Sequence, residues 1–226
     1  MRNKKWILGI VLIAVATALA YAQSPASDFK YVIVENEEVH IIEYIGRSTV
    51  VSIPPQIRNL PVTLIGAESF SNKNLTRVII PDSVIVIDSL AFAYNRIPEV
   101  TIPSSVRIIG VGAFYQSRVR SVTILGPCEI WTMAFAGNEH GSLTSLNIAD
   151  NSVIAGGAFG ELLDLMNLTQ ITLGSNIYLA TPFVDTELDV RFNNVFLLGL
   201  DDLYITLGRR AGTYTYRNGR WNESFR

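Results

Sequence analysis

The sequence contains little of what metal centres and disulfide frameworks need. Cys128 is the only cysteine among 226 residues, so an intramolecular disulfide framework and a cysteine-rich zinc site are both excluded. Two histidines, His40 and His140, leave few ligands for any other metal centre. We therefore expect no metal and no cofactor.

Charge is also scarce. Charged residues make up 17% of the chain and hydrophobic residues 49%, which is too apolar for a disordered protein. The formal net charge is −2, so the composition does not indicate a nucleic-acid binder. A chain of this length predicts one domain of ordinary size.

Motifs of catalysis are missing as well. The sequence has no Gly-x-Ser-x-Gly elbow, His-Glu-x-x-His motif, P-loop or dinucleotide fingerprint. The glycine-rich run at residues 156–160 is interpreted as a bend of the chain rather than a phosphate loop. Cys128 is interpreted as a small, semi-buried thiol rather than a reactive one. The sequence thus predicts a protein that is not an enzyme and has no catalytic residue.

The first 22 residues are typical of a secretory signal peptide. Residues 1–5 carry three basic side chains, residues 6–20 are an uncharged apolar run, and Ala20 and Ala22 place small residues before a cut after Ala22. An uncleaved membrane anchor is the alternative. However, 15 helical residues rise only about 22 Å, against about 30 Å of hydrocarbon.

Cleavage would change the charge of the remaining protein. Removal of the three basic residues leaves 15 basic and 20 acidic residues, a net charge of −5. No later stretch is long and apolar enough to span a membrane. We expect export to the periplasm, to the outer surface or into the medium.

The rest of the chain carries an internal repeat. Phenylalanines that follow a small residue recur every 21, 22 or 24 residues, mostly with an isoleucine five positions earlier, and the two columns extend to Phe183 and Tyr178. Each of the five phenylalanines from Phe70 to Phe159 is followed by an apolar triplet of the form L-x-x-L-x-L. All 15 positions of these five triplets are apolar. The predicted core comprises Phe70, Phe92, Phe114, Phe135, Phe159, Ile87, Ile109, Val100, Ile102, Val122 and Ile124.

This spacing predicts a leucine-rich-repeat solenoid, because each short unit needs stacked neighbours to bury its apolar residues. The expected fold is an α/β-type solenoid, mainly β: a right-handed superhelix of about five to six coils with a cap at each end. The last two triplet residues would lie on a short strand with alternate side chains pointing inward.

Four segments resemble the BspA-like leucine-rich-repeat proteins, which are exported surface proteins of oral anaerobes, treponemes and some protozoa. The repeat unit appears in residues 78–92 and 100–114, and residues 50–66 resemble the opening coil of that family. Residues 208–221 look like a C-terminal ending of treponemal members. The resemblance covers about residues 30 to 221. It implies adhesion to host matrix or to other cells.

The remaining segments predict the caps. Residues 30–44 have the pattern of two short strands around Asn36-Glu37, a hairpin that would cover the first coil. Residues 213–221 alternate and contain Asn218-Gly219, a signal for a type I′ turn. The expected organisation is a signal peptide at 1–22, an N-terminal cap with the first coil at 23–66, the repeats at 67–182 and a C-terminal cap at 183–226.

Outward-facing residues of the strands are the candidate binding site. They form two columns across the concave sheet, one of them mostly small, polar or β-branched, which suits an exposed strand and also the docking of an extended partner. Arg96, Arg118 and Arg120 could add a small basic ridge. The candidate residues are Arg77, Ile79, Glu99, Thr101, Ser121, Thr123, Ser145, Asn147, Gln170 and Thr172.

Three functions remain open at this stage. The first is a protein-binding module that adheres to host extracellular matrix, such as fibronectin, or to other cells through the concave face. The second is a structural envelope protein that self-associates, as a homo-oligomer without a host ligand, through a solenoid edge or the C-terminal cap. The third is a hydrolase that uses the irregular part after Leu188, where Asp201, Asp202 or His140 would be tested.

Overall fold

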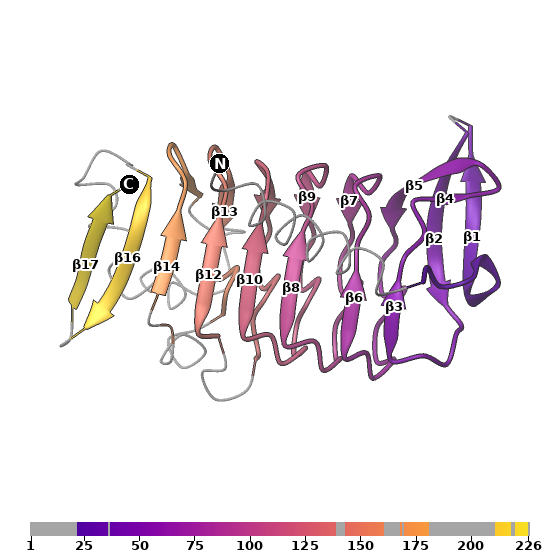
Figure 1. Cartoon of the computed structure of the whole chain (residues 1–226), viewed down its shortest axis with the longest axis horizontal. Coiled ribbons are helices and arrows are strands. Elements are labelled where there is room, and N and C mark those ends of the chain that lie inside the picture. The colour runs from indigo at the N-terminus through magenta and orange to yellow at the C-terminus, as the bar shows by residue number, and fades with distance from the viewer. Residues whose placement is uncertain are drawn as a thin grey trace, which may run out of the picture.

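The chain forms a stack of short β-strands that coil around one long core (Figure 1). This computed structural model describes residues 22–35, 37–138, 143–160, 168, 170–180, 211–217 and 220–225. The one helix among these residues is the short 3-10 helix η1 (Ala26–Asp28). The solenoid predicted from the repeat, mainly β and of about five turns, is confirmed.

One sheet has nine strands in the order β1-β2-β5-β7-β9-β11-β13-β15, with β4 beside β5. The strands from β5 to β15 are parallel, as coils of a solenoid require. Their bounds are β1 Phe29–Val34, β2 Glu38–Tyr44, β4 Gln56–Ile57, β5 Leu60–Ile65, β7 Val86–Ile87, β9 Ile108–Ile109, β11 Glu129–Ile130, β13 Val153–Ala155 and β15 Tyr178–Ala180.

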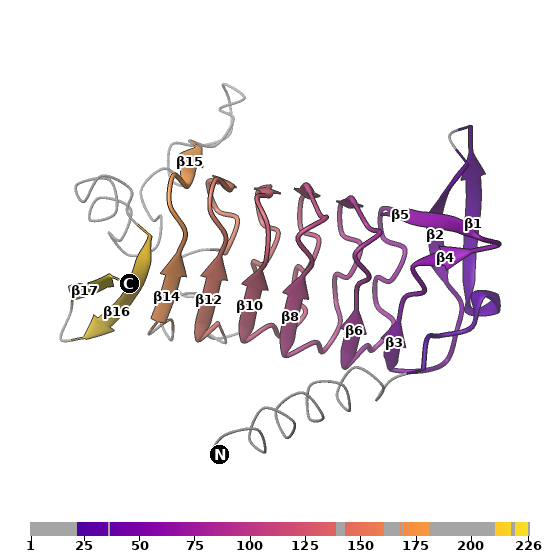
Figure 2. The same cartoon turned by 45° about the horizontal axis from the view of Figure 1, so that its top comes forward.

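A second sheet has six strands in the order β17-β16-β14-β12-β10-β8, and β3 pairs with β6 in a separate two-stranded sheet. Each coil therefore contributes one strand to each side of the stack (Figure 2). The bounds are β3 Val50–Ser52, β6 Arg77–Ile79, β8 Glu99–Ile102, β10 Ser121–Ile124, β12 Ser145–Ile148, β14 Gln170–Leu173, β16 Gly212–Arg217 and β17 Arg220–Phe225.

The phenylalanine column is a continuous stack of rings. Consecutive ring centroids from Phe70 to Phe159 lie 4.9, 5.1, 5.1 and 5.5 Å apart, close to the usual spacing of paired strands. Tyr44 stacks on Phe70 at 5.4 Å, so the N-terminal cap continues the column. All eleven residues of the predicted core are buried, and neighbouring coils therefore share one core.

One position of the predicted isoleucine column is wrong. Ile154 pairs with Leu179, and Tyr178 pairs with Val153 instead. Tyr178 consequently points outward and is 53% exposed. The sequence interval is one residue longer here than expected, and a shift of one residue moves a strand side chain to the other face. Phe183, which set the expected register, lies outside the described residues.

Buried polar side chains line the inside of the coils after the phenylalanine column. Asn95, Ser117 and Asn138 occupy equivalent positions three residues after Phe92, Phe114 and Phe135, and all three are at most 3% exposed. The Asn95 amide accepts a hydrogen bond from the N–H of Leu75 and donates to backbone carbonyls, including that of Phe70. These side chains thereby satisfy backbone groups that the turns leave without a partner.

Both expected caps are present as antiparallel hairpins. The strands β1 and β2 pair at one end of the stack, where Lys30 donates a 2.6 Å hydrogen bond to Glu43. At the other end β16 pairs with both β14 and β17, and Tyr214 and Trp221 cover the last core residues. The turn residues Asn218 and Gly219 lie outside the described part of the chain.

Candidate partner-binding faces

The six-stranded sheet presents the predicted columns in register. Ser121 lies beside Glu99 and Ser145, and Thr123 lies beside Thr101 and Asn147. The next strand adds Gln170 and Thr172 to the two columns. The residues between them in each strand, such as Val122 and Leu146, point into the core. The alternation predicted from the sequence therefore sets the outer surface of this sheet.

The C-terminal hairpin extends both columns by two strands, which the sequence analysis did not predict. Thr213 and Thr215 face Thr172 and Gln170 across β14 and β16, and Ser224 and Asn222 follow in β17. The Thr-Tyr-Thr pattern of β16 matches the outward-inward-outward pattern of the repeat strands, so the signal was present in the sequence. We call the outward residues of this sheet the front face: Glu99, Thr101, Ser121, Thr123, Ser145, Asn147, Gln170, Thr172, Thr213, Thr215, Asn222 and Ser224.

Two candidate residues lie outside this sheet. Arg77 and Ile79 belong to β6, which pairs with β3 and not with β8. In other coils, the residue just before the strand donates its backbone N–H to a carbonyl of the preceding coil. Before β10, for example, the N–H of Arg120 bonds the carbonyl of Pro98 at 2.8 Å. Pro98 holds the equivalent position before β8 and has no N–H to donate, which accounts for the break in the sheet.

Hydroxyl and amide groups dominate the front face. Eight of the twelve residues are Thr or Ser, three are Asn or Gln, and Glu99 at the edge strand is the one charged residue among them; Arg217 and Arg220 hold the next positions of the same alternation in β16 and β17. The hydroxyls of Thr172 and Thr213 lie 3.2 Å apart, as expected for a cross-strand threonine pair. Each hydroxyl can donate and accept a hydrogen bond, so the face can bind a polar partner without a strong preference for charge.

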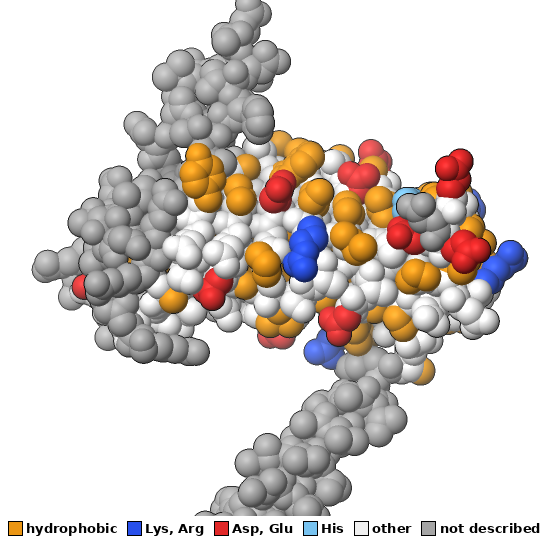
Figure 3. Space-filling model, turned by 90° about the horizontal axis from the view of Figure 1, so that it is seen from above, with side chains coloured by type: hydrophobic (Ala, Val, Ile, Leu, Met, Phe, Trp, Pro, Cys, Tyr) orange, Lys and Arg blue, Asp and Glu red, His pale blue; other side chains and the backbone are white. Residues whose placement is uncertain are grey.

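The nine-stranded sheet has a different outer surface. The outward residues of its repeat strands are Val86, Ile108, Glu129, Val153 and Tyr178, and Figure 3 shows hydrophobic side chains along this side of the stack with charged side chains among them. We call this surface the upper face: Ile85, Val86, Ile108, Val111, Trp131, Met133, Val153 and Tyr178. Five of the eight are 37–53% exposed. Exposed apolar side chains on neighbouring coils are typical of interaction sites, and the triplet pattern of the sequence does not contain these residues.

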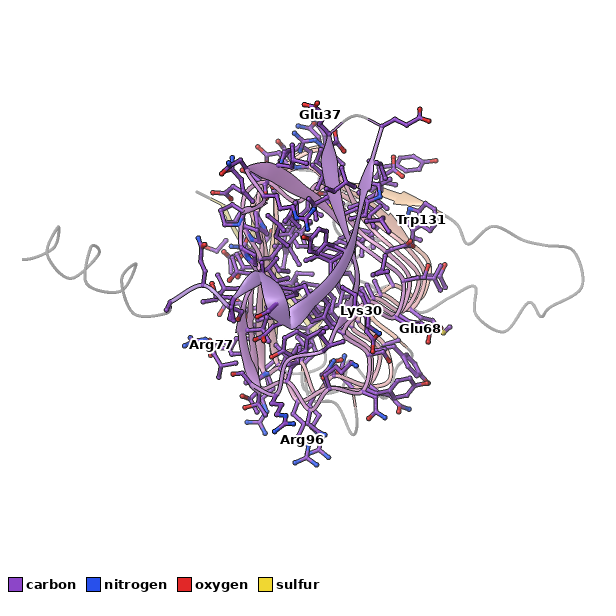
Figure 4. The ribbon with its side chains drawn as sticks, turned by 90° about the vertical axis from the view of Figure 1, so that its right-hand side faces the viewer. Lys30, Glu37, Glu68, Arg77, Arg96 and Trp131 are labelled. Carbon is purple, nitrogen blue, oxygen red and sulfur yellow. The ribbon has the colours of Figure 1, made fainter. Side chains whose placement is uncertain are left out.

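The predicted basic ridge does not lie on either face. Arg96 and Arg118 occupy equivalent positions in adjacent coils and are exposed, as is Arg120. Figure 4 shows Arg96 pointing away from the core on a different side from Arg77. These arginines therefore line an edge of the stack beside the front face.

None of the described residues forms a recognisable catalytic or metal site. His40 lies on β2 with its Nε2 atom 4.0 Å from the Glu38 carboxylate. Burial, with a smaller effect of Glu129, raises the pKa of the Cys128 thiol to about 12, so it is protonated at neutral pH. In the described part of the chain, no three His, Cys, Asp or Glu side chains are grouped as metal ligands. His140, Asp201 and Asp202 lie outside it.

The coils are stacked, their repeat strands run parallel within each sheet, and phenylalanines form a column in the core. These features define a leucine-rich-repeat solenoid. Within that class, the BspA type leucine rich repeat region matches residues 62–181 in six copies. The match covers more than half of the chain, and the protein belongs to this family. The resemblance noted in the sequence is thereby confirmed.

Several solved structures are similar to this chain. A leucine-rich-repeat protein of T. pallidum is 19% identical, with a TM-score of 0.49 over 70% of this chain and 86% of that one. One from Bacteroides capillosus is 23% identical, with a TM-score of 0.33 over 71% and 99%. One from Bacteroides ovatus is 18% identical, with a TM-score of 0.38 over 73% and 56%. No curated protein matches the sequence.

The repeat fold of this family is consistent with a protein-interaction module. Leucine-rich-repeat proteins of this type are binding scaffolds that are typically surface-associated. Across the described residues, no helix has the length and apolar character to cross a membrane. The stack offers two long faces of different chemistry on one core.

Proposed function

We propose that the protein is an exported binding module that adheres to host extracellular matrix or to other cells through its front face. The observation that carries the proposal is the register of the twelve front-face residues across six strands. They make a continuous polar surface on a rigid core, which suits an extended partner. Membership of a family of binding scaffolds supports the same function.

The composition of the front face fits adhesion rather than catalysis. Its hydroxyls and amides offer many weak hydrogen bonds, and its twelve residues include no histidine or cysteine. Binding through many repeated contacts gains strength when partner and protein are both displayed on surfaces. A matrix protein with long extended segments is the kind of partner that uses such a surface.

A solid-phase assay tests adhesion directly. Purified protein is titrated against immobilised fibronectin, fibrinogen and laminin, with albumin as the control surface. Saturable binding to at least one matrix protein and none to albumin is the expected result. Absence of saturable binding to all three would contradict adhesion to these matrix proteins.

Export rests on the basic start and apolar run of residues 1–22. Intact producing cells treated with external protease should lose the protein if it is displayed on the surface. Protection in intact cells, followed by loss after the outer membrane is opened, indicates the periplasm. Protein that still carries residues 1–22 and stays inside the cytoplasm would contradict export.

A further inference from the structure

The basic ridge of Arg96, Arg118 and Arg120 lies at the edge where β8 and β10 begin, and all three residues are exposed. The N–H of Ile97, next to Arg96, bonds the carbonyl of Ser117, next to Arg118, at 2.8 Å. Arg96 and Arg118 therefore extend from backbone positions side by side in neighbouring coils. Arg120 directly precedes β10, so the third guanidinium starts two residues further along the same coil.

Carboxylates do not neutralise this ridge. In the described part of the chain, none of its three arginines forms an ion pair. The segments 94–99 and 116–121 hold these arginines and one carboxylate, Glu99, a net charge of +2. Asp82 and Asp150 come after β6 and β12, so they lie at the opposite edge of the stack. Figure 4 shows Glu68 on a different side of the stack from the ridge residue Arg96.

Hydrogen bonds between coils hold the backbone of the ridge. The N–H of Arg96 donates to the carbonyl of Leu75 at 2.8 Å, and that of Arg120 donates to the carbonyl of Pro98 at 2.8 Å. The carbonyl of Arg120 in turn accepts from the N–H of Thr144 at 2.9 Å. The arginines thus extend from a fixed frame, and a ligand has to order only their side chains.

The chemistry of the ridge fits a ligand that carries several anions. A guanidinium presents a planar fork of donors that binds a sulfate, phosphate or carboxylate group through two hydrogen bonds. Neighbouring coils are about 4.8 Å apart, so the ridge matches anions that recur every few ångströms along a chain. Charges separated by more than about 8 Å are largely screened at physiological salt, and the acidic net charge of the rest of the protein therefore acts weakly here.

The surroundings of the ridge favour a saccharide over a protein. Protein interfaces depend on apolar and aromatic anchors, but Ile97 and Val119, between the ridge positions, are fully buried. On the front-face side, Ser121 directly follows the ridge and offers a hydroxyl group. Tyr94, two residues before Arg96, is 47% exposed and lies edge-on to Tyr115, with ring centroids 5.7 Å apart. Tyrosine rings of this kind pack against the C–H groups of a sugar and hydrogen-bond its hydroxyls.

We propose that the basic ridge binds a sulfated polysaccharide of the extracellular matrix. Sulfate groups lie on the guanidinium groups of Arg96, Arg118 and Arg120, and sugar hydroxyls bind the serine and threonine hydroxyls at the adjoining edge of the front face. The inference rests on the proposed adhesion to matrix and adds a class of ligand to it. An acidic protein segment is the other partner that three arginines could recruit, and the experiment separates the two.

Heparin serves as the sulfated probe. The purified wild-type protein is passed over immobilised heparin in a surface-plasmon-resonance assay at physiological salt. Saturable binding that disappears in about 1 M salt is the expected result. Heparin stripped of its sulfate groups should bind about tenfold more weakly or less, because the charged hydrogen bonds are lost. Poly-glutamate should compete poorly at an equal concentration of charge, and competition as strong as that of free heparin would overturn the proposal in favour of an acidic protein partner.

Matched variants locate the binding on the ridge. Variant R96Q/R118Q/R120Q should bind heparin about tenfold more weakly than the wild type or less. Variant K30Q/R47Q/R58Q removes the same three positive charges from exposed residues of the N-terminal region and should bind like the wild type. Unfolding temperatures show that each variant is folded; if the ridge variant is not, R96Q and R118Q are measured singly, and each should weaken binding.

Two results would overturn the proposal: no saturable binding of the wild type to heparin, or equal losses in the ridge variant and the N-terminal variant. Binding to fibronectin, fibrinogen and laminin is read in a separate assay. A wild-type protein that binds a matrix protein but not heparin would therefore contradict the polysaccharide site alone. Absence of binding to all three matrix proteins, with heparin binding intact, would contradict only the proposed adhesion to those proteins.

Discussion

Asn95 is a residue whose side chain holds backbone in place inside the coil. Its amide makes one hydrogen bond to the N–H of Leu75 and three to backbone carbonyls, while 3% of the residue is exposed. Asn95→Ala leaves buried groups unsatisfied, so we expect a loss of about 2–3 kcal/mol in the free energy of unfolding. Asn147→Ala, on the exposed front face, should stay within about 0.5 kcal/mol. Urea denaturation measures both, and equal effects would contradict the role of Asn95.

Cys128 is a second residue with a measurable consequence. Burial raises its pKa to about 12, so the folded protein holds a neutral and shielded thiol at pH 8. We expect no reaction with a disulfide reagent such as DTNB at pH 8 until denaturant is added, and then one thiol per chain. Rapid labelling of the folded protein would contradict this burial.

The same pKa gives a dependence of stability on pH. The thiol has an ordinary pKa of 9.0 and a pKa of about 12 in the folded chain. Its contribution to stability is therefore full below pH 9 and is lost progressively between pH 9 and 12. Comparison with Cys128→Ala isolates this effect from that of Tyr44, whose pKa burial also raises. The wild type should lose more stability than the variant over this range, and equal losses would contradict the shift.

At the scale of the element, the stacked phenylalanine column stabilises the coils. Phe114 is fully buried, with ring neighbours at 5.1 Å on both sides. We expect Phe114→Ala to lower the free energy of unfolding by about 3–5 kcal/mol, because it empties a buried aromatic site. Thr123→Ala, on the front face, should cost little. If both substitutions were equally mild in thermal and urea unfolding, the assignment of the coil would be wrong.

The elements that repeat were also the ones that the sequence predicted well. Apolar residues at fixed intervals located the core columns and the outward strand positions, and the hairpin caps followed from alternation around turn residues. The turns themselves were less visible. Gly112 and Gly157 have the positive φ that glycine favours, but Leu90 and Met133 hold the same turn position in neighbouring coils with φ of 57° and 59°. Leucine and methionine give no sequence signal for such a turn.

The candidate site was predicted in part for the same reason. The outward columns of β8 to β14 follow from the alternation of apolar and polar residues in the repeat strands. Their continuation into β16 and β17 depends on the pairing of the C-terminal hairpin with β14, which the sequence does not specify. The break before β8 arises from a single missing N–H at Pro98. The upper-face residues lie outside the phenylalanine, isoleucine and triplet columns of the repeat. The sequence therefore does not show that they share one side of the molecule until the coils are stacked.

At the scale of the whole molecule, one rigid stack separates several surfaces. A polar front face and a largely apolar upper face run along its length. A partner bound along the front face leaves the upper face accessible.

The central claim is that the front face binds the partner. Its most direct test is binding to immobilised fibronectin, fibrinogen and laminin by the wild type and two folded variants with three added arginines each. Thr101→Arg/Thr123→Arg/Thr172→Arg alters the front face, and Ile85→Arg/Val111→Arg/Met133→Arg alters exposed positions of the upper face. We predict saturable wild-type binding that falls at least tenfold in the front-face variant and is unchanged in the upper-face variant. Loss in the upper-face variant alone, or no wild-type binding, would contradict the account.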